Sequence, residues 1–222
     1  MKKIIVGALL VLGLMAPVAP ASAGVLDKLY ENLVQEYWIW AFNQPEATNP
    51  LVGNAPFCGV SKDGKFAMLS GYILGNEKQE RSCTISRNQS LYLSVLSGIY
   101  IAFESDDPST KTYEAMLDAA DCPDATGTVK VDGIPFNVSW SHTKTGIFEF
   151  PVADGGLLRD WIGDEQSDGA VVEGIHVVLP PLLRGKHTVS WHAESVSCGF
   201  DSDGDGTPEP LVKDFVYKLD VR

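Results

Sequence analysis

The C-terminal segment of the chain carries the clearest alternation of apolar and polar residues. Within Val212 to Val221, apolar side chains fall at every second position from Phe215 to Val221, and the positions between them are charged apart from Val216. Successive side chains of a β-strand point to opposite faces, so the sequence predicts a strand with one packed and one solvent-exposed face. The packed face would carry Phe215, Tyr217, Leu219 and Val221, and the solvent face Asp214, Lys218, Asp220 and Arg222.

Short apolar runs separated by turn residues follow one another after Pro50, which is typical of β-strands. Besides the last strand, the pattern predicts strands at Lys65 to Leu74, Leu91 to Phe103, Gly127 to Val131, Ile134 to Trp140, Gly146 to Phe150, Ala170 to Leu179 and His187 to Val196. Asp132-Gly133 lies between two of them and favours a two-residue hairpin turn. The expected core comprises Phe66, Leu91, Leu93, Phe148, Ile175, Val177, Val189, Phe215, Tyr217 and Leu219.

Three segments show helical spacing instead. Val25 to Asn43 carries apolar residues three and four apart and predicts an amphipathic helix that ends before Pro45. Shorter helices are expected at about Ser109 to Ala120 and Leu157 to Ile162. The helix-end residues Trp38 and Trp40 are interpreted as docked on a sheet, with a sugar or membrane contact as the alternative.

The fold class that these segments predict is mainly β. We expect an antiparallel β-sandwich, jelly-roll-like or immunoglobulin-like, with an N-terminal helix and one or two short helices. The expected organisation is a signal peptide over residues 1–23, an N-terminal helix over 24–48, and a β-sandwich over 49–222 with an acidic loop insertion at 198–210.

The first 23 residues indicate export. Lys2 and Lys3 precede an apolar run from Ile4 to Val18, and the small residues Ala21 and Ala23 suit cleavage by signal peptidase. The run is too short for a stable membrane span, so no span is expected in the mature chain. The sequence therefore predicts a secreted, periplasmic or cell-envelope protein with cleavage near Ala23.

Cleavage would leave a strongly acidic chain. It removes Lys2 and Lys3 from the 17 basic residues, which leaves 15 basic against 29 acidic residues and a formal net charge of −14. A field of that sign repels phosphates and anionic lipids. Nucleic acid is therefore excluded as an expected partner, whereas cations, glycans and other proteins are not.

Four cysteines in an oxidising compartment predict two disulfides. Three connectivities are open, and we favour Cys58 with Cys83 and Cys122 with Cys198. The first pair brackets a plausible hairpin, and the second ties the middle of the chain to its end.

Several short motifs together resemble a widespread group of secreted bacterial proteins that has no assigned activity. They are Trp38 and Trp40 with Asn49-Pro50; Cys58 and Gly64 before Phe66 to Gly71; Arg81, Cys83, Thr84 and Ile85; Val131-Asp132-Gly133-Ile134-Pro135; Leu182, Gly185, His187, Thr188 and Val189; and Asp214, Tyr217, Leu219 and Val221. The resemblance implies a secreted β-sandwich with Cys58 and Cys83 paired, and it implies no catalytic residues.

One segment carries an explicit ligand pattern. Carboxylates stand at alternate positions in Asp201, Asp203 and Asp205, with small residues between them, and Glu209 follows. Such spacing is typical of loops that point several oxygens at a calcium ion. Val212 stands where such loops place a bidentate glutamate, and strand patterns flank the segment. We predict a structural calcium site; the alternative is a solvated acidic turn.

Catalytic signals are weak. His187 and His192 lie an odd number of residues apart on one predicted strand, so they should point to opposite faces. The acidic group Asp160, Asp164, Glu165 and Asp168 could supply paired carboxylates for a hydrolase. The leading hypothesis is a secreted module that binds a glycan or a protein or has a structural role; the alternative is a hydrolase of unrecognised type that uses acidic residues. Exposed Trp140, Trp161 or Trp191 would favour glycans, because aromatic rings stack on sugars.

Overall fold

A computed structural model describes residues 23–52, 58–71, 78–136, 142–200 and 209–222. The helical elements are α1 (Ala23–Phe42), η1 (Glu46–Thr48), η2 (Pro108–Lys111), α2 (Tyr113–Ala120) and α3 (Leu157–Ile162). The strands are β1 (Cys58–Val60), β2 (Phe66–Leu69), β3 (Gln79–Ile85), β4 (Ser90–Phe103), β5 (Thr126–Val131), β6 (Ile134–Phe136), β7 (His142–Lys144), β8 (Ser167–Leu179), β9 (Gly185–Phe200) and β10 (Glu209–Val221).

The strands form two five-stranded sheets, which confirms the predicted mainly β fold. Sheet A has the order β1-β2-β4-β8-β7, and sheet B has the order β3-β10-β9-β5-β6. Most pairings are antiparallel, as expected, but β2 runs parallel to β4 and β3 runs parallel to β10. Both sheets are therefore mixed, and the two parallel pairs are a departure from the antiparallel pairing expected.

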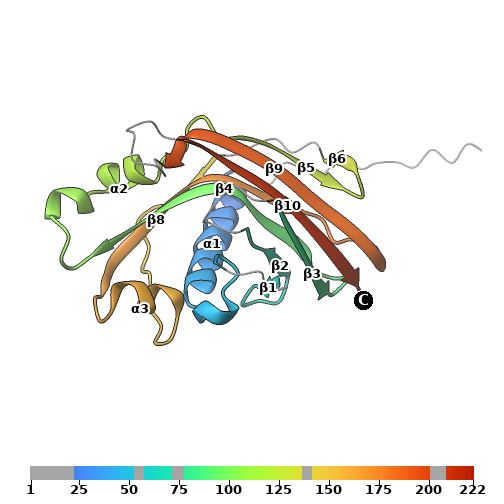
Figure 1. The fold of residues 1–222 in the computed structure, drawn as a ribbon, viewed down its shortest axis with the longest axis horizontal. Coiled ribbons are helices and arrows are strands. Elements are labelled where there is room, and N and C mark those ends of the chain that lie inside the picture. Colours follow the sequence, from blue (N-terminus) through green and yellow to red (C-terminus); the bar gives the residue numbers. More distant parts are fainter. Residues whose placement is uncertain (1–22, 53–57, 72–77, 137–141, 201–208) are drawn as a thin grey trace, which may run out of the picture.

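The elements stack in three layers (Figure 1): sheet B, sheet A and helix α1. One face of sheet A packs against sheet B around the buried residues Leu93, Ile175, Trp191 and Tyr217. Its other face packs against α1 and α3, and Tyr92 lies in this second cluster. Sheet A is thus buried on both faces, whereas sheet B presents its outer face to solvent.

The N-terminal helix ends as its sequence predicts. α1 stops at Phe42, before Pro45, and the buried side-chain amide of Asn49 donates hydrogen bonds to the carbonyl oxygens of Ala41 and Gln44. These bonds satisfy acceptors that a helix end leaves open. Trp38 is buried against sheet A, which confirms that this part of the helix is docked on a sheet.

Local turn chemistry is also correctly predicted. Asp132 and Gly133 both have positive φ, 51° and 77°, and they join β5 to β6 with Val131 opposite Ile134. Positive φ at both central residues is the signature of the hairpin turn expected for Asp-Gly.

Other boundaries differ from the prediction. Gly146 to Phe150 is not a strand, because only Phe148 bridges to Ala170. The short strands β1, β3 and β7 carry too few alternating apolar residues to have been predicted from the pattern. Of the expected strands, β2 is shorter and ends at Leu69; residues 72–74 and 137–140 lie outside the described part of the chain.

The predicted core is confirmed with one exception. All the expected core residues are buried apart from Phe66, which is half-buried. In β10 the predicted face, from Phe215 to Val221 at alternate positions, points inward. Lys213 continues this inward row and is only 8% exposed, and burial lowers the pKa of its ammonium to about 8.

A buried polar joint connects the three layers at Ser70, directly after β2. The Tyr37 hydroxyl of α1 donates to Ser70 Oγ over 2.9 Å. The Tyr217 hydroxyl of β10 donates to the Ser70 carbonyl oxygen over 2.8 Å and accepts from the Ser70 amide over 3.2 Å. Arg81 Nη1 of β3 donates to the same carbonyl over 3.1 Å. Helix, sheet A and sheet B therefore meet at one residue.

None of the helices within the described ranges is both long and apolar enough to cross a membrane.

The polar joint at Ser70 predicts how the loss of the Tyr217 hydroxyl oxygen should change stability. Tyr217→Phe should lower the free energy of unfolding by about 1 to 3 kcal/mol, because it leaves the buried Ser70 amide without its acceptor. Urea unfolding monitored by fluorescence is the measurement. Tyr113→Phe removes the same atom from an exposed side chain and should leave the midpoint unchanged; equal effects of the two substitutions would show that the joint does not stabilise the fold.

Candidate functional site

The residues predicted to bind calcium are largely outside the described structure. Asp201, Asp203 and Asp205 lie in residues 201–208, outside the described ranges. Glu209 is the first residue of β10, but its side chain is not described. Among the described residues, no group of three or more His, Cys, Asp or Glu side chains could hold a metal ion. The calcium site therefore stays a prediction.

Both predicted disulfides are formed with the favoured connectivity. Cys58 of β1 pairs with Cys83 of β3, and Cys122 pairs with Cys198 of β9. The first joins an edge of sheet A to an edge of sheet B. The second ties the segment after α2, which packs on sheet A, to sheet B. The two disulfides thus connect the layers at separate places.

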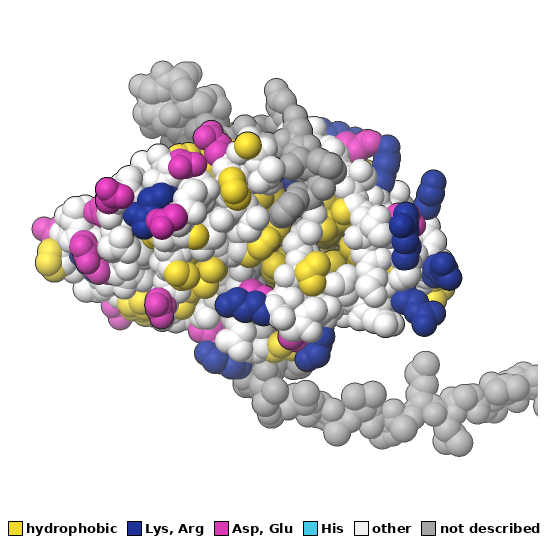
Figure 2. Space-filling model, turned by 90° about the horizontal axis from the view of Figure 1, so that it is seen from below, with side chains coloured by type: hydrophobic (Ala, Val, Ile, Leu, Met, Phe, Trp, Pro, Cys, Tyr) yellow, Lys and Arg dark blue, Asp and Glu magenta, His cyan; other side chains and the backbone are white. Residues whose placement is uncertain are grey.

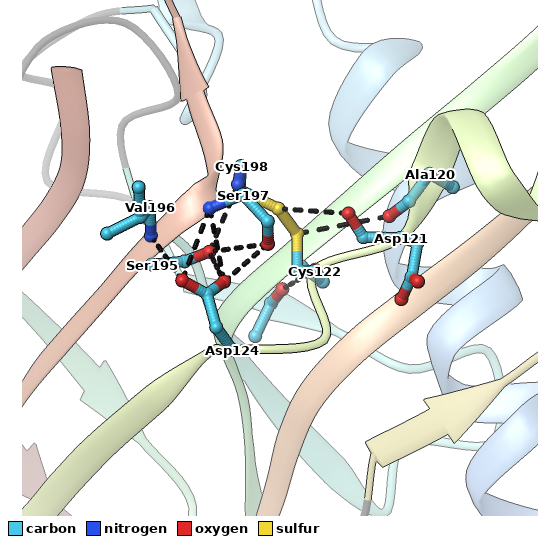
Figure 3. Close-up of a disulfide and its surroundings, with 10 residues drawn as sticks. Ala120, Asp121, Cys122, Asp124, Ser195, Val196, Ser197 and Cys198 are labelled. Atoms are coloured by element: carbon cyan, nitrogen blue, oxygen red, sulfur yellow. Dashed lines mark hydrogen bonds between the residues drawn. A yellow bond between two sulfur atoms is a disulfide. The ribbon is translucent and has the colours of Figure 1, made fainter. Parts of the chain in front are cut away.

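The surroundings of the second disulfide are shown in Figure 3. Asp124 accepts hydrogen bonds from the Val196 amide over 2.7 Å and from the Ser195 hydroxyl over 2.5 Å, and the Ser197 amide and hydroxyl also donate to it. The two hydroxyl bonds, Ser195 first, hold the pKa of the Asp124 carboxyl well below its usual range. This carboxylate, with the disulfide, fixes the end of β9.

The predicted acidic group does not form a catalytic pair. Asp168 forms an ion pair with Lys111 at 2.6 Å, and Glu165 accepts a hydrogen bond from the Ser105 amide. Asp160 and Asp164 are exposed on α3 and in the loop after it. The side chains of Glu165 and Asp168 are thus occupied by separate partners.

A different pair of carboxylates does face each other. Glu173 of β8 lies beside the Asp121 carboxyl, and Lys144 Nζ lies 2.8 Å from Glu173 Oε1. Burial, more than any neighbour, raises the pKa of Glu173. Glu173 Oε2 and Asp121 Oδ1 are both buried, so the facing oxygens are closed to a substrate.

The histidines are separated as predicted. His187 Nδ1 lies 2.7 Å from Asp132 Oδ2, and His192 Nδ1 lies 3.0 Å from Asp214 Oδ1 on the opposite face of sheet B. His176 is buried in sheet A, where its Nδ1 is 2.8 Å from the Tyr92 hydroxyl. The Asp132 hydrogen bond raises the pKa of His187.

A hollow lies on the outer face of sheet B. We call this outer face the open face. It consists of the outward-pointing residues of four adjacent strands: Glu80, Ser82 and Thr84 of β3; Val212, Asp214, Val216, Lys218 and Asp220 of β10; Lys186, Thr188, Ser190, His192 and Glu194 of β9; and Thr126, Thr128 and Lys130 of β5. The hollow measures about 460 Å³ and is lined by side chains of β3, β10 and β9, with Thr188 opposite Lys218 at its centre.

A second hollow of about 180 Å³ continues along the same face toward β5. Thr128, Lys130, Ser190 and His192 line it, together with Lys78 just before β3. Trp191 contributes to its floor, but its side chain points into the core and is only 2% exposed. Of the tryptophans whose exposure would favour a glycan ligand, Trp191 is therefore buried, Trp161 is 49% exposed on α3, and Trp140 lies outside the described residues.

Sequence patterns located only part of this face. The solvent face of β10 was predicted from its alternation, but the lysines of β5 and β9 were not singled out. Continuing the same alternation along Gly127 to Val131 and His187 to Val196 places Lys130, Thr188, Ser190 and His192 outward. That signal could have found the face without the structure.

Comparisons with known proteins add no assignment. No protein-family model matches the chain, and no curated protein matches it. Among solved structures, the solution structure of Amebosin aligns with 67% of this chain and 100% of its own, at 9% identity and a TM-score of 0.18. A likeness at that TM-score carries no argument about fold or function. The resemblance to the secreted bacterial group stays a prediction.

The Asp132–His187 pair predicts a measurable pH dependence. Asp132→Asn should lower the pKa of His187 toward its usual value of about 6.5, because the hydrogen-bonded anion is lost while the Asn oxygen can still accept from the Thr188 amide. A raised folded pKa stabilises the fold below the unfolded value, and that stability is lost as pH rises through the folded value. The variant should therefore lose most stability at mildly acidic pH.

NMR titration of the histidine ring protons measures the shift directly. Asp63→Asn, in the turn between β1 and β2, is the control and should leave His187 unchanged. An unaltered titration of His187 in Asp132→Asn would contradict the assigned cause.

Proposed function

We propose that the mature chain is a secreted or cell-envelope β-sandwich module that binds a glycan through the open face of sheet B. The observation that carries the proposal is the 460 Å³ hollow lined by Ser82, Thr84 and Thr188. Serine and threonine hydroxyls both donate and accept hydrogen bonds, as sugar hydroxyls do. The export signal and the two disulfides support a location outside the cytoplasm.

The backbone under this face favours recognition. The inward side chains of β9 and β10 are packed in the core, and the Cys58–Cys83 disulfide anchors the neighbouring strand β3. The side chains of the open face therefore stand on a rigid support, which reduces the entropy lost on binding.

A hydrolase, the alternative class, is less well supported. The carboxylates that face each other, Asp121 and Glu173, have buried oxygens, whereas glycoside cleavage needs two carboxylates on either side of an accessible bond. The acidic residues of the α3 region that could have served instead are exposed or held by Lys111 and Ser105.

A glycan array probed with the secreted protein tests the proposal. We expect binding to at least one glycan, and Thr188→Trp should abolish it by filling the hollow with an indole ring. Leu183→Trp introduces the same ring at an 83% exposed position outside the hollow and should leave binding unchanged. Absence of any glycan signal, or binding that survives Thr188→Trp, would overturn the proposal.

We also propose that the acidic segment binds calcium as a structural ion. Asp201, Asp203 and Asp205 place three like charges within five residues, and a cation relieves that repulsion. The segment follows β9, whose end is fixed by the Cys122–Cys198 disulfide and by Asp124, so its attachment point is rigid.

Binding should raise thermal stability by mass action, by about 2.7 kcal/mol at calcium a hundredfold above the dissociation constant. Asp203→Asn combined with Asp205→Asn should remove this gain without unfolding the calcium-free protein. Calorimetric melting with calcium and with magnesium is the measurement. Identical melting temperatures with and without millimolar calcium would leave the segment as a solvated acidic turn.

A further inference from the structure

The two hollows of the open face are rich in lysine although the chain as a whole is acidic. The two hollows are lined by Lys78, Lys130, Lys186 and Lys218, against the carboxylates of Asp214 and Asp220. The chain as a whole has the opposite balance, with 17 basic and 29 acidic residues. The excess of lysine is confined to the linings of the two hollows, because Glu80 and Glu194 bring the carboxylates of the whole open face to four, as many as the lysines.

The carboxylates beside these lysines are already engaged. Asp220 forms an ion pair with Arg222 at 2.6 Å, Asp214 bonds His192 at 3.0 Å, and Glu80 pairs with Lys218. Glu194 lies farther along β9, opposite Val212 and Thr126 and outside both hollows.

Three ammonium groups have no such partner. Within the described ranges, no salt bridge or side-chain hydrogen bond involves Lys78, Lys130 or Lys186. Lys130 lies opposite Ser190, and Lys186 lies opposite Asp220, so they stand in different hollows. A long anion could contact both.

The charges on the face seen from the α1 side are also unevenly distributed. Seen from the α1 side, acidic side chains gather at the end that carries α2 and α3, and Lys and Arg gather at the opposite end, where β3 and β10 finish (Figure 2). The larger hollow, with Lys186 and Lys218, lies at this basic end.

Neutral hydrogen-bonding groups complete the face. The hydroxyls of Ser82, Thr84, Thr128, Thr188 and Ser190 have no protein partner in the described structure. No described Phe, Tyr or Trp side chain stands on the open face, because Trp191 and Phe215 point into the core, and the imidazole of His192 there is held by Asp214. Single-stranded nucleic acids are held by stacking on aromatic rings, and protein interfaces use buried aromatic or arginine anchors. The face offers neither.

We propose that the open face binds an anionic polysaccharide, in which Lys78, Lys130 and Lys186 contact carboxylates and the serine and threonine hydroxyls contact the sugar rings. This inference rests on the proposed function and names its ligand class. Each carboxylate–ammonium contact is a charge-assisted hydrogen bond, and an extended chain can reach the lysines of both hollows at once. Polygalacturonate, a polymer of uronic acid, is the probe, and dextran is the neutral comparison.

The first measurement is binding of the purified secreted protein to immobilised polygalacturonate over a range of salt. Three neutralised carboxylates predict a fall in affinity of about tenfold or more between about 50 and 200 mM salt, by analogy with the release of counterions from a single-stranded polyanion. Dextran should not bind. Binding of dextran with equal affinity, or a salt-independent affinity for polygalacturonate, would overturn the inference while leaving a glycan-binding function intact.

The second measurement uses a matched pair of variants. Lys130→Gln with Lys186→Gln should weaken binding about tenfold at low salt and reduce the steepness of the salt dependence. Lys28→Gln with Lys65→Gln changes the net charge equally, at side chains that are 64% and 75% exposed outside the open face, and should have no effect. Equal losses of affinity in both variants would show that only net charge matters and would overturn the assignment of the binding site to the open face.

Two further outcomes separate the alternatives. A single-stranded oligonucleotide bound as tightly as polygalacturonate, with the same dependence on Lys130 and Lys186, would show that the face reads charge alone and would overturn the polysaccharide assignment. A protein that binds no glycan at all, neutral or anionic, would overturn the proposed function together with this inference.

Discussion

The fold depends on how the inner face of sheet B is held against sheet A, and Ser70 is where polar chemistry fixes that contact. A hydrophobic interface between two sheets tolerates some sliding, because apolar contact has no direction. The hydrogen bonds from Tyr217 and Arg81 to the Ser70 backbone do have direction, and they set β10 and β3 against the end of β2. Tyr37 adds the helix to the same point.

This constraint determines which residues of sheet B face solvent. A slip of one residue in β10 would turn its inward row outward and would bury Asp214 and Lys218. With Tyr217 held at Ser70, the alternate positions of β10 must point away from the core, and β9 and β5 follow through their register with β10. The contact between Tyr217 and Ser70 in the interior thus decides which residues form the open face.

The features that the sequence predicted are those with local causes. The β10 alternation, the Asp132-Gly133 turn and the end of α1 before Pro45 each depend on a few neighbouring residues. The parallel pairs β2–β4 and β3–β10 depend on residues far apart in the chain, and no local pattern encodes them. In β3 the inward positions include Gln79 and Arg81. Because Arg81 belongs to the polar joint at Ser70, β3 lacks the hydrophobic alternation that would have marked it as a strand.

The candidate site was harder to predict for the same reason. Lys78, Lys130 and Lys186 belong to different parts of the chain, and they line neighbouring hollows only because β3, β10, β9 and β5 are adjacent. The lysines of the open face can attract an anion although the molecule as a whole is acidic, because dissolved salt limits the distance over which charges act. The Debye length is about 8 Å at physiological ionic strength and about 30 Å at 0.01 M. At physiological salt, an anionic chain on the open face responds mainly to the nearby lysines. At very low salt it would also be repelled by the acidic end of the molecule, so the attraction of the face is best isolated at intermediate ionic strength.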